Sequence, residues 1–126
     1  MMNLSKKEEQ LMGYIWRAEK IFLKEIIECY PEPKPATTTI ATLLKRLQDK
    51  GFLSYEVFGN SRQYYPLVKK SDYFSKEVKG IINKFFNNSA PQFASFFTSS
   101  NDLTIEELES LKKLVDSEIQ KKKKND

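Results

Sequence analysis

The feature that most limits how this chain can fold is a proline-rich connector, Pro31-Glu32-Pro33-Lys34-Pro35. Proline lacks a backbone donor and disfavours a helical conformation in the residue before it, so no helix can run through this segment. Apolar residues recur at helical spacing on both sides, over residues 23–30 and 37–47. The sequence therefore predicts two short helices separated by a stiff connector, with Gly51 ending the second helix in the left-handed conformation.

Another helix and a short strand are predicted before this pair. Ser5 and Glu8 have the spacing of a capping box, in which each side chain bonds the backbone N–H of the other residue. The helix that they begin is expected to end near Ala18, and Ile21-Phe22 is expected to form a short strand.

A hairpin is predicted after the third helix. Residues 52–57 and 63–67 are rich in strand-forming side chains, and Gly59-Asn60-Ser61 between them is typical of a tight turn. Three short helices followed by a two-stranded hairpin is the element order of a winged helix-turn-helix. The predicted fold is therefore mainly α with a small β-hairpin.

Residues 71–126 are predicted to add three more helices. Ser71 is expected to cap the first, which Asn87-Asn88-Ser89 interrupts, and Thr104 with Glu107 forms a capping box at the start of the last. We interpret residues 1–70 as a winged-helix DNA-binding domain and residues 71–126 as a helical dimerisation domain. The closing lysines, 121–124, are expected to be frayed.

Many apolar side chains in the second half have no obvious partner within one chain, which favours burial against an identical copy. The alternative is that they fill the core of a monomer. The candidate dimerisation residues are Phe74, Val78, Ile81, Ile82, Phe85, Phe93, Phe96, Phe97, Leu108, Leu111, Leu114 and Val115.

The start of the third helix carries the candidate binding chemistry. Threonine is a mediocre helix former, so four threonines in six positions indicate a function such as contact with base edges in the DNA major groove. Residues 1–70 also hold twelve Lys or Arg against eight Asp or Glu. Alternatively, Thr37 only caps the helix, the other threonines are neutral surface, and the hairpin arginine is merely solvated. The candidate DNA-binding residues are Thr37, Thr38, Thr39, Ala41, Thr42, Lys45, Arg46 and Arg62.

Composition argues against an enzyme. The chain has no histidine and one cysteine, Cys29, so it cannot form a disulfide, a His/Cys zinc site or a Ser-His-Asp triad within itself. No metal or cofactor is expected, and Cys29 is expected to be a small buried residue. With no membrane-spanning run and no signal-peptide pattern, the protein is expected to be cytoplasmic.

Several segments together resemble the penicillinase-repressor family of bacterial transcription regulators, the BlaI/MecI type. They are Leu4–Trp16, Lys24-Glu25-Ile26, Thr38–Phe52, Gln63–Val68 and Asp102–Leu108. The resemblance implies a homodimer that represses transcription by binding a palindromic operator in double-stranded DNA, with a resistance or stress operon as the candidate target. The rival interpretation is a winged-helix protein-interaction module.

The resemblance also bears on regulation. Some repressors of this family are cut by a membrane sensor-protease near the position that matches Ser95, Phe96 and Phe97, but the Asn-Phe pair typical of the cut site is missing here. Control by cleavage therefore stays open. Copper sensing is not expected, because the chain lacks the C-terminal cysteine cluster of the copper-responsive members.

Overall fold

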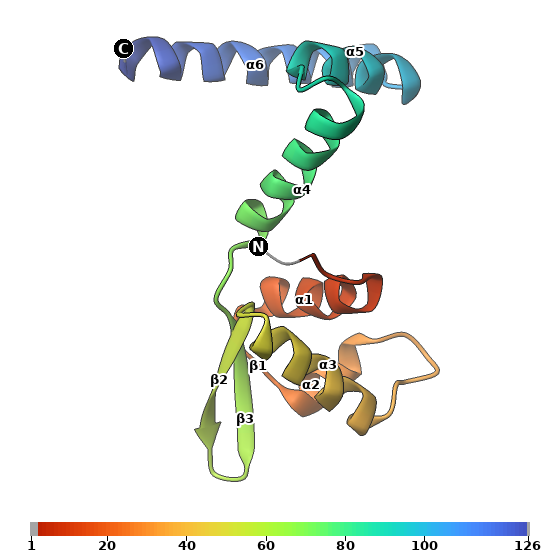
Figure 1. Cartoon of the computed structure of the whole chain (residues 1–126), viewed down its shortest axis with the longest axis vertical. Coiled ribbons are helices and arrows are strands. Elements are labelled where there is room, and N and C mark those ends of the chain that lie inside the picture. Colours follow the sequence, from red (N-terminus) through yellow and green to blue (C-terminus); the bar gives the residue numbers. More distant parts are fainter. Residues whose placement is uncertain (1–2, 126) are drawn as a thin grey trace. The chain divides into compact units, whose positions relative to one another are not determined.

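The computed structural model describes residues 3–125, over which the chain forms six helices and one three-stranded antiparallel sheet (Figure 1). The mainly helical fold with a small hairpin is thus confirmed. The chain divides into two compact units, Met1–Ser75 and Lys76–Asp126, with the boundary inside α4. The elements are α1 Lys6–Ala18, β1 Ile21–Phe22, α2 Leu23–Cys29, α3 Thr37–Asp49, β2 Leu53–Phe58, β3 Ser61–Pro66, α4 Lys70–Phe85, α5 Ala90–Ser100 and α6 Ile105–Asn125.

The predicted signals that begin α1 and end α3 are confirmed. The Ser5 N–H donates to Glu8 Oε1 at 2.8 Å and the Glu8 N–H donates to Ser5 Oγ at 3.2 Å, which completes the capping box of α1. Gly51 ends α3 with φ +83°, and the Phe52 N–H donates back to the Leu47 carbonyl at 2.9 Å. These bonds satisfy terminal backbone groups that helical hydrogen bonding leaves over.

The sheet has the order β1-β3-β2. The predicted hairpin pairs Tyr55 with Tyr64, and Gly59 supplies the positive φ, +61°, that its turn requires. The short strand β1 joins the other edge of β3, where Ile21 lies opposite Tyr64. The hairpin is thus part of a three-stranded sheet, because the chain between α1 and α2 returns to pair with it.

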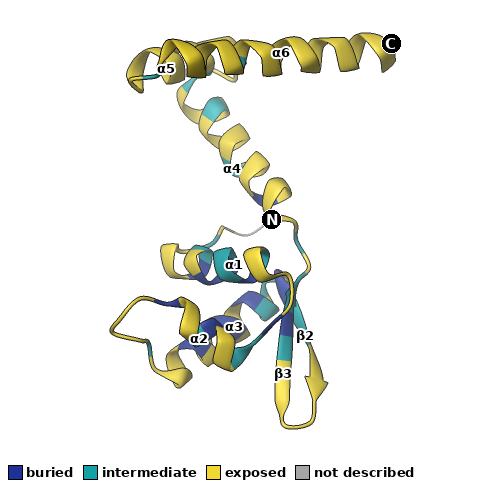
Figure 2. Cartoon of the chain, turned by 180° about the vertical axis from the view of Figure 1, so that it is seen from behind, coloured by how far each residue is buried: buried dark blue, intermediate teal, exposed yellow. Residues whose placement is uncertain are grey.

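Every buried side chain of residues 3–125 lies in the first unit (Figure 2). Helices α1–α3 and the sheet contribute apolar side chains to one core, and the first turn of α4 adds Tyr73. Burial of this surface supplies most of the favourable free energy of folding. The apolar core residues are Leu11, Met12, Ile15, Ile21, Ile26, Tyr30, Ile40, Leu43, Leu44, Leu47, Phe52, Leu53, Tyr64 and Tyr73.

Helices α4, α5 and α6 form most of the second unit. Asn87 and Asn88 end α4 with φ of +52° and +59°. The Thr104 N–H donates to Glu107 Oε1 at 3.0 Å and the Glu107 N–H donates to Thr104 Oγ1 at 3.0 Å, so the second capping box is also confirmed. These hydrogen bonds lower the pKa of the Glu107 carboxyl.

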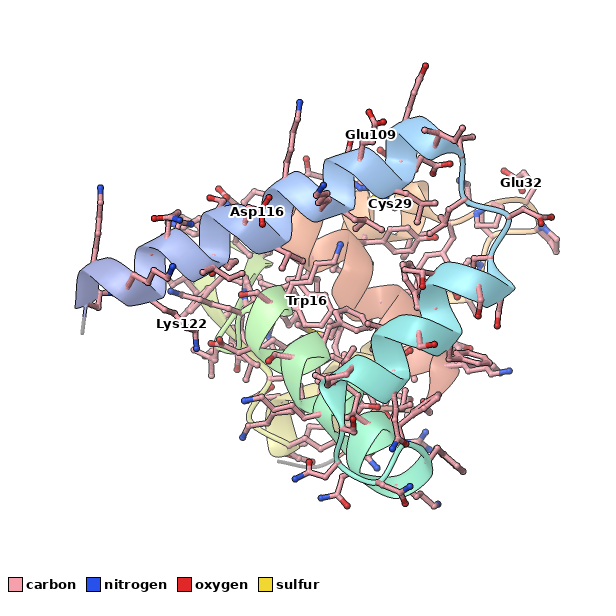
Figure 3. The ribbon with its side chains drawn as sticks, turned by 90° about the horizontal axis from the view of Figure 1, so that it is seen from above. Trp16, Cys29, Glu32, Glu109, Asp116 and Lys122 are labelled. Atoms are coloured by element: carbon pink, nitrogen blue, oxygen red, sulfur yellow. The ribbon has the colours of Figure 1, made fainter. Side chains whose placement is uncertain are left out.

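Three local predictions are wrong. Helix α4 begins at Lys70, so Ser71 lies inside its first turn, and the Lys69 carbonyl accepts from the Tyr73 N–H at 3.1 Å. The lysine tail is helical to Asn125 (Figure 3), because lysine is a good helix former and its charge is favourable at a helix C-terminus. Cys29 is exposed, since Ile26 and Tyr30 take the inward positions at that end of α2.

Candidate nucleic-acid interface

Helix α3 has one buried face and one open face. Ile40, Leu43, Leu44 and Leu47 pack into the core of the first unit. All seven candidate α3 residues are exposed: Thr37, Thr38, Thr39, Ala41, Thr42, Lys45 and Arg46.

Two side chains on the open face of α3 already make polar contacts within the helix. The Thr42 hydroxyl donates to the Thr38 carbonyl at 2.9 Å, which leaves its oxygen lone pairs and its methyl group for another contact. Lys45 Nζ lies 3.0 Å from Asp49 Oδ1 in an exposed ion pair. Such a pair contributes little and exchanges readily for a phosphate. Among the described residues, Arg46 has no ion-pair partner.

Arg62 is the candidate residue on the wing, and it lies on β3 opposite Val57. Its guanidinium carbon is 4.3 Å from the centroid of the Tyr55 ring. Stacking occupies one face of the guanidinium plane and leaves N–H groups at its edge to donate to an oxygen ligand. The Tyr55 ring therefore restricts the movement of the Arg62 guanidinium.

A hollow of about 490 Å³ lies where α2, the start of α3 and the hairpin meet. It brings Thr37 and Ala41 of α3 together with Arg62 of the wing; the other α3 candidates do not line it. Three exposed polar residues at its rim were not predicted as binding residues: Lys24, Asn60 and Ser61. The positive charge of Lys24 could have identified it as a candidate binding residue, whereas the sequence around Asn60 and Ser61 indicated only a turn. Its lining is Phe22, Leu23, Lys24, Ile27, Thr37, Ala41, Asn60, Ser61, Arg62 and Tyr64.

The candidate dimerisation residues fall into three groups. Phe74 belongs to the first unit, where its ring centroid lies 5.8 Å from that of Trp16. Ile82, Phe93 and Leu111 are half-buried. The exposed group is Val78, Ile81, Phe85, Phe96, Phe97, Leu108, Leu114 and Val115.

An aromatic cluster joins the end of α4 to α5. The ring of Phe86 lies 5.5 Å from that of Phe93 and 5.3 Å from that of Phe96. The second unit thus packs part of its aromatic surface within the chain, yet none of its described residues is buried. Some apolar surface therefore lacks cover in a single chain.

The structure also locates the candidate cleavage position. Ser95, Phe96 and Phe97 are exposed and lie in the middle of α5. The Ser95 carbonyl accepts from Ser99 Oγ at 2.7 Å, in addition to its place in the helix.

Residues 3–125 contain neither a metal-binding cluster nor a membrane-spanning helix. No group of three or more Asp, Glu or Cys side chains is placed to hold a metal ion. No helix within this range is both long and apolar enough to cross a membrane.

The three-helix core, the antiparallel wing and the exposed threonine-rich helix define a winged-helix transcription regulator. The family model for the penicillinase repressor matches residues 4–117, and the chain belongs to this family. The resemblance seen in the sequence is thereby confirmed.

Two related proteins match nearly the full length of the chain in sequence, and one solved structure matches its first half in fold. The methicillin resistance regulatory protein MecI of Staphylococcus aureus (strain N315) is 32% identical over 113 residues, which are 89% of this chain and 92% of that protein. The penicillinase repressor of Bacillus licheniformis is 27% identical over 121 residues, or 95% and 94% of the two chains. The solution structure of the DNA binding domain of the repressor BlaI superposes with a TM-score of 0.51 and 33% identity, covering 56% of this chain and 88% of that one.

Proposed function

We propose that the protein is a homodimeric repressor that binds a palindromic operator and blocks transcription from the promoter that contains it. The observation that carries this proposal is the exposed threonine and basic face of α3 beside Arg62 of the wing. Membership of a repressor family supports it. Two copies of such a unit match the two half-sites of a palindrome. A resistance or stress operon is the proposed target.

The candidate residues fall into two proposed groups: readers, which contact base edges, and anchors, which bind phosphates. Thr38, Thr39, Ala41 and Thr42 would face base edges, where a threonine methyl can contact the thymine methyl and a hydroxyl oxygen can accept a hydrogen bond. Thr37, Lys45, Arg46 and Arg62 would hold phosphates and fix the register of the protein on the duplex. We add Lys24, Asn60 and Ser61 to the anchors, because they share a hollow with Thr37 and Arg62.

Dimerisation is assigned to the second unit. Its apolar side chains are exposed along α4, α5 and α6, and a hollow of about 440 Å³ between α5 and α6 is lined by Phe97, Leu103 and Leu111 among others. Large exposed apolar patches are rare on monomers and typical of subunit interfaces. A symmetric dimer would cover the same patch on both copies.

Cleavage by a sensor-protease would act on this unit. Proteases need an extended segment, so a cut at Ser95–Phe97 requires α5 to unwind first. Such a cut would separate the helices that we assign to the dimer.

Salt dependence tests the proposed DNA binding. A dimer that makes about six to ten phosphate contacts should lose roughly 10³–10⁵-fold in affinity between 50 and 200 mM salt. The measurement is fluorescence anisotropy with duplexes selected from a random pool. We expect selection to yield a palindrome whose half-site centres lie about one or more helical turns apart. A nearly flat salt response with no selected sequence would favour the protein-interaction module instead.

Two substitutions separate reading from anchoring. Thr42→Ala should reduce discrimination between operator and scrambled DNA by on the order of 1 kcal/mol while sparing nonspecific affinity, because a base-edge contact is lost. Arg62→Ala should weaken binding to all sequences alike and reduce the salt slope by about one. Competition binding at several salt concentrations measures both effects.

Matched controls exist for both substitutions. Thr98 of α5 makes the same hydroxyl bond to the carbonyl four residues earlier, at 2.8 Å, so Thr98→Ala should leave DNA binding unchanged. Arg17→Ala removes an exposed charge outside the proposed interface. If Thr42→Ala kept the full specificity ratio while Arg62→Ala abolished it, the wing would become the reader and our placement of α3 would be wrong.

A further inference from the structure

The first turn of α4 is fixed to the first unit through Tyr73, which is 2% exposed. The Tyr73 hydroxyl donates to Glu9 Oε2 of α1 at 2.7 Å and accepts from the Leu4 N–H at 3.4 Å. Its ring centroid lies 5.6 Å from that of Phe52 in an edge-to-face contact. A tyrosine buried on all sides and hydrogen-bonded at its tip has little freedom to rotate.

The segment that leads into α4 is held as well. The Leu67 N–H donates to the Phe52 carbonyl at 2.8 Å, and Trp16 Nε1 donates to the Val68 carbonyl at 2.8 Å. Trp16 also packs on Phe74. The chain from Leu67 to Phe74 is therefore a tethered segment rather than a flexible linker.

This anchoring matters because α4 is one helix that begins in the first unit and enters the second. A continuous helix transmits direction and rotation far better than a loop does. The contacts of Tyr73 thus fix how the chain leaves the winged-helix unit. In the proposed dimer, each winged-helix unit is joined to the second unit of its own chain through this helix.

We propose that the Tyr73–Glu9 hydrogen bond is a positioning contact that determines which half-site spacing the dimer accepts. This inference rests on the proposed function, since it needs two winged-helix units bound to one operator. Once one winged-helix unit of the dimer has bound its half-site, the other unit binds at a high effective concentration if it is held near the second half-site. If the start of α4 is held less firmly, that concentration falls at the best half-site spacing, and other spacings are tolerated better.

The test uses Tyr73→Phe, which keeps the ring and its aromatic contacts but removes the hydroxyl. Affinity is measured for duplexes whose two half-sites are moved apart in single base-pair steps, and for a duplex with a single half-site. We expect single half-site affinity within about twofold of the wild type, about tenfold weaker binding at the best spacing, and a flatter spacing profile.

Other variants distinguish positioning from general destabilisation. Glu9→Ala removes the acceptor and should reproduce the flat profile even where Tyr73→Phe folds poorly. Glu9→Gln keeps an acceptor oxygen and should restore the wild-type profile. Tyr14→Phe is the control. It removes the hydroxyl of a tyrosine on α1 that accepts from Gln10 Nε2 at 3.2 Å, and it should leave the spacing profile unchanged.

Two outcomes are decisive. A wild-type spacing profile in folded Tyr73→Phe and Glu9→Ala proteins would overturn the positioning role while leaving dimeric DNA binding intact. A wild-type protein without any preference for two half-sites over one would contradict the proposed function itself.

Discussion

Replacing Phe85 with aspartate should convert a dimer into a monomer without unfolding the chain. Phe85 is 67% exposed at the end of α4, with Lys84 Nζ 5.3 Å from its ring centroid. A well-packed aromatic side chain at the centre of a subunit interface can contribute about 2 kcal/mol or more, and aspartate in its place would bury an unpaired charge. We therefore expect the dimer dissociation constant to rise at least about 30-fold.

Analytical ultracentrifugation at micromolar concentration measures this change against the 14.8 kDa mass of one chain. Asn83→Asp is the matched control, because it adds the same carboxylate to an exposed polar position of the same helix. Operator affinity should fall with dimerisation, by a factor on the order of 10²–10⁴, once the two half-sites are no longer linked. A monomeric wild type, or an unchanged Phe85→Asp dimer, would contradict the assignment of the second unit.

Local sequence patterns predicted several helix ends, although they misplaced the start of α4 and the end of α6. The capping boxes at Ser5 and Thr104 and the helix end at Gly51 each depend on residues within a few positions of one another. Pairings between distant segments, in contrast, could not be predicted from local patterns. The pairing of β1 with β3 joins residues 43 apart, Ile21 and Tyr64, and no local pattern specifies that register.

The same contrast between local patterns and long-range contacts applies to the candidate interface. The exposed face of α3 follows from the 3.6-residue period, so its threonines could be placed from the sequence alone. The roles that we propose for Lys24 and Asn60 depend on where α2 and the hairpin tip meet in space. Likewise, the hydrogen bond between Tyr73 and Glu9 spans 64 positions, and the sequence offers no signal that pairs them.

The ion pair between Glu8 and Lys50 was also invisible in the sequence, because it joins the start of α1 to the end of α3. Glu8 is 3% exposed, and its Oε1 lies 2.8 Å from Lys50 Nζ. Burial alone raises the pKa of the Glu8 carboxyl, but the hydrogen bonds from Lys50 and Ser5 outweigh burial and lower it. Both donors therefore favour the ionised carboxylate in the folded protein.

Replacing Lys50 with methionine should cost about 3–5 kcal/mol of unfolding free energy at pH 7, because it leaves a buried carboxylate without its counter-charge. Urea denaturation at 25 °C measures this loss. Lys45→Met is the control, since it breaks the exposed pair with Asp49 and should cost less than about 1 kcal/mol. Glu8→Gln combined with Lys50→Met removes the buried charge, keeps an acceptor for the Ser5 N–H, and should recover most of the lost stability.

The pH dependence of the unfolding free energy tests the ion pair between Glu8 and Lys50 independently. In the wild type the folded pKa of Glu8 is lowered, so its stabilisation is complete above the unfolded pKa, about 4.3, and is lost as the pH falls through the folded pKa. In Lys50→Met the hydrogen bond and the charge of Lys50, both of which lower this pKa, are lost, so the folded pKa of Glu8 lies above its wild-type value. The stability difference between the two proteins should therefore shrink as the pH falls from 7 to about 4. A difference that stays constant over this range, or a loss no larger than that of Lys45→Met, would mean that the Glu8 charge is not held by Lys50.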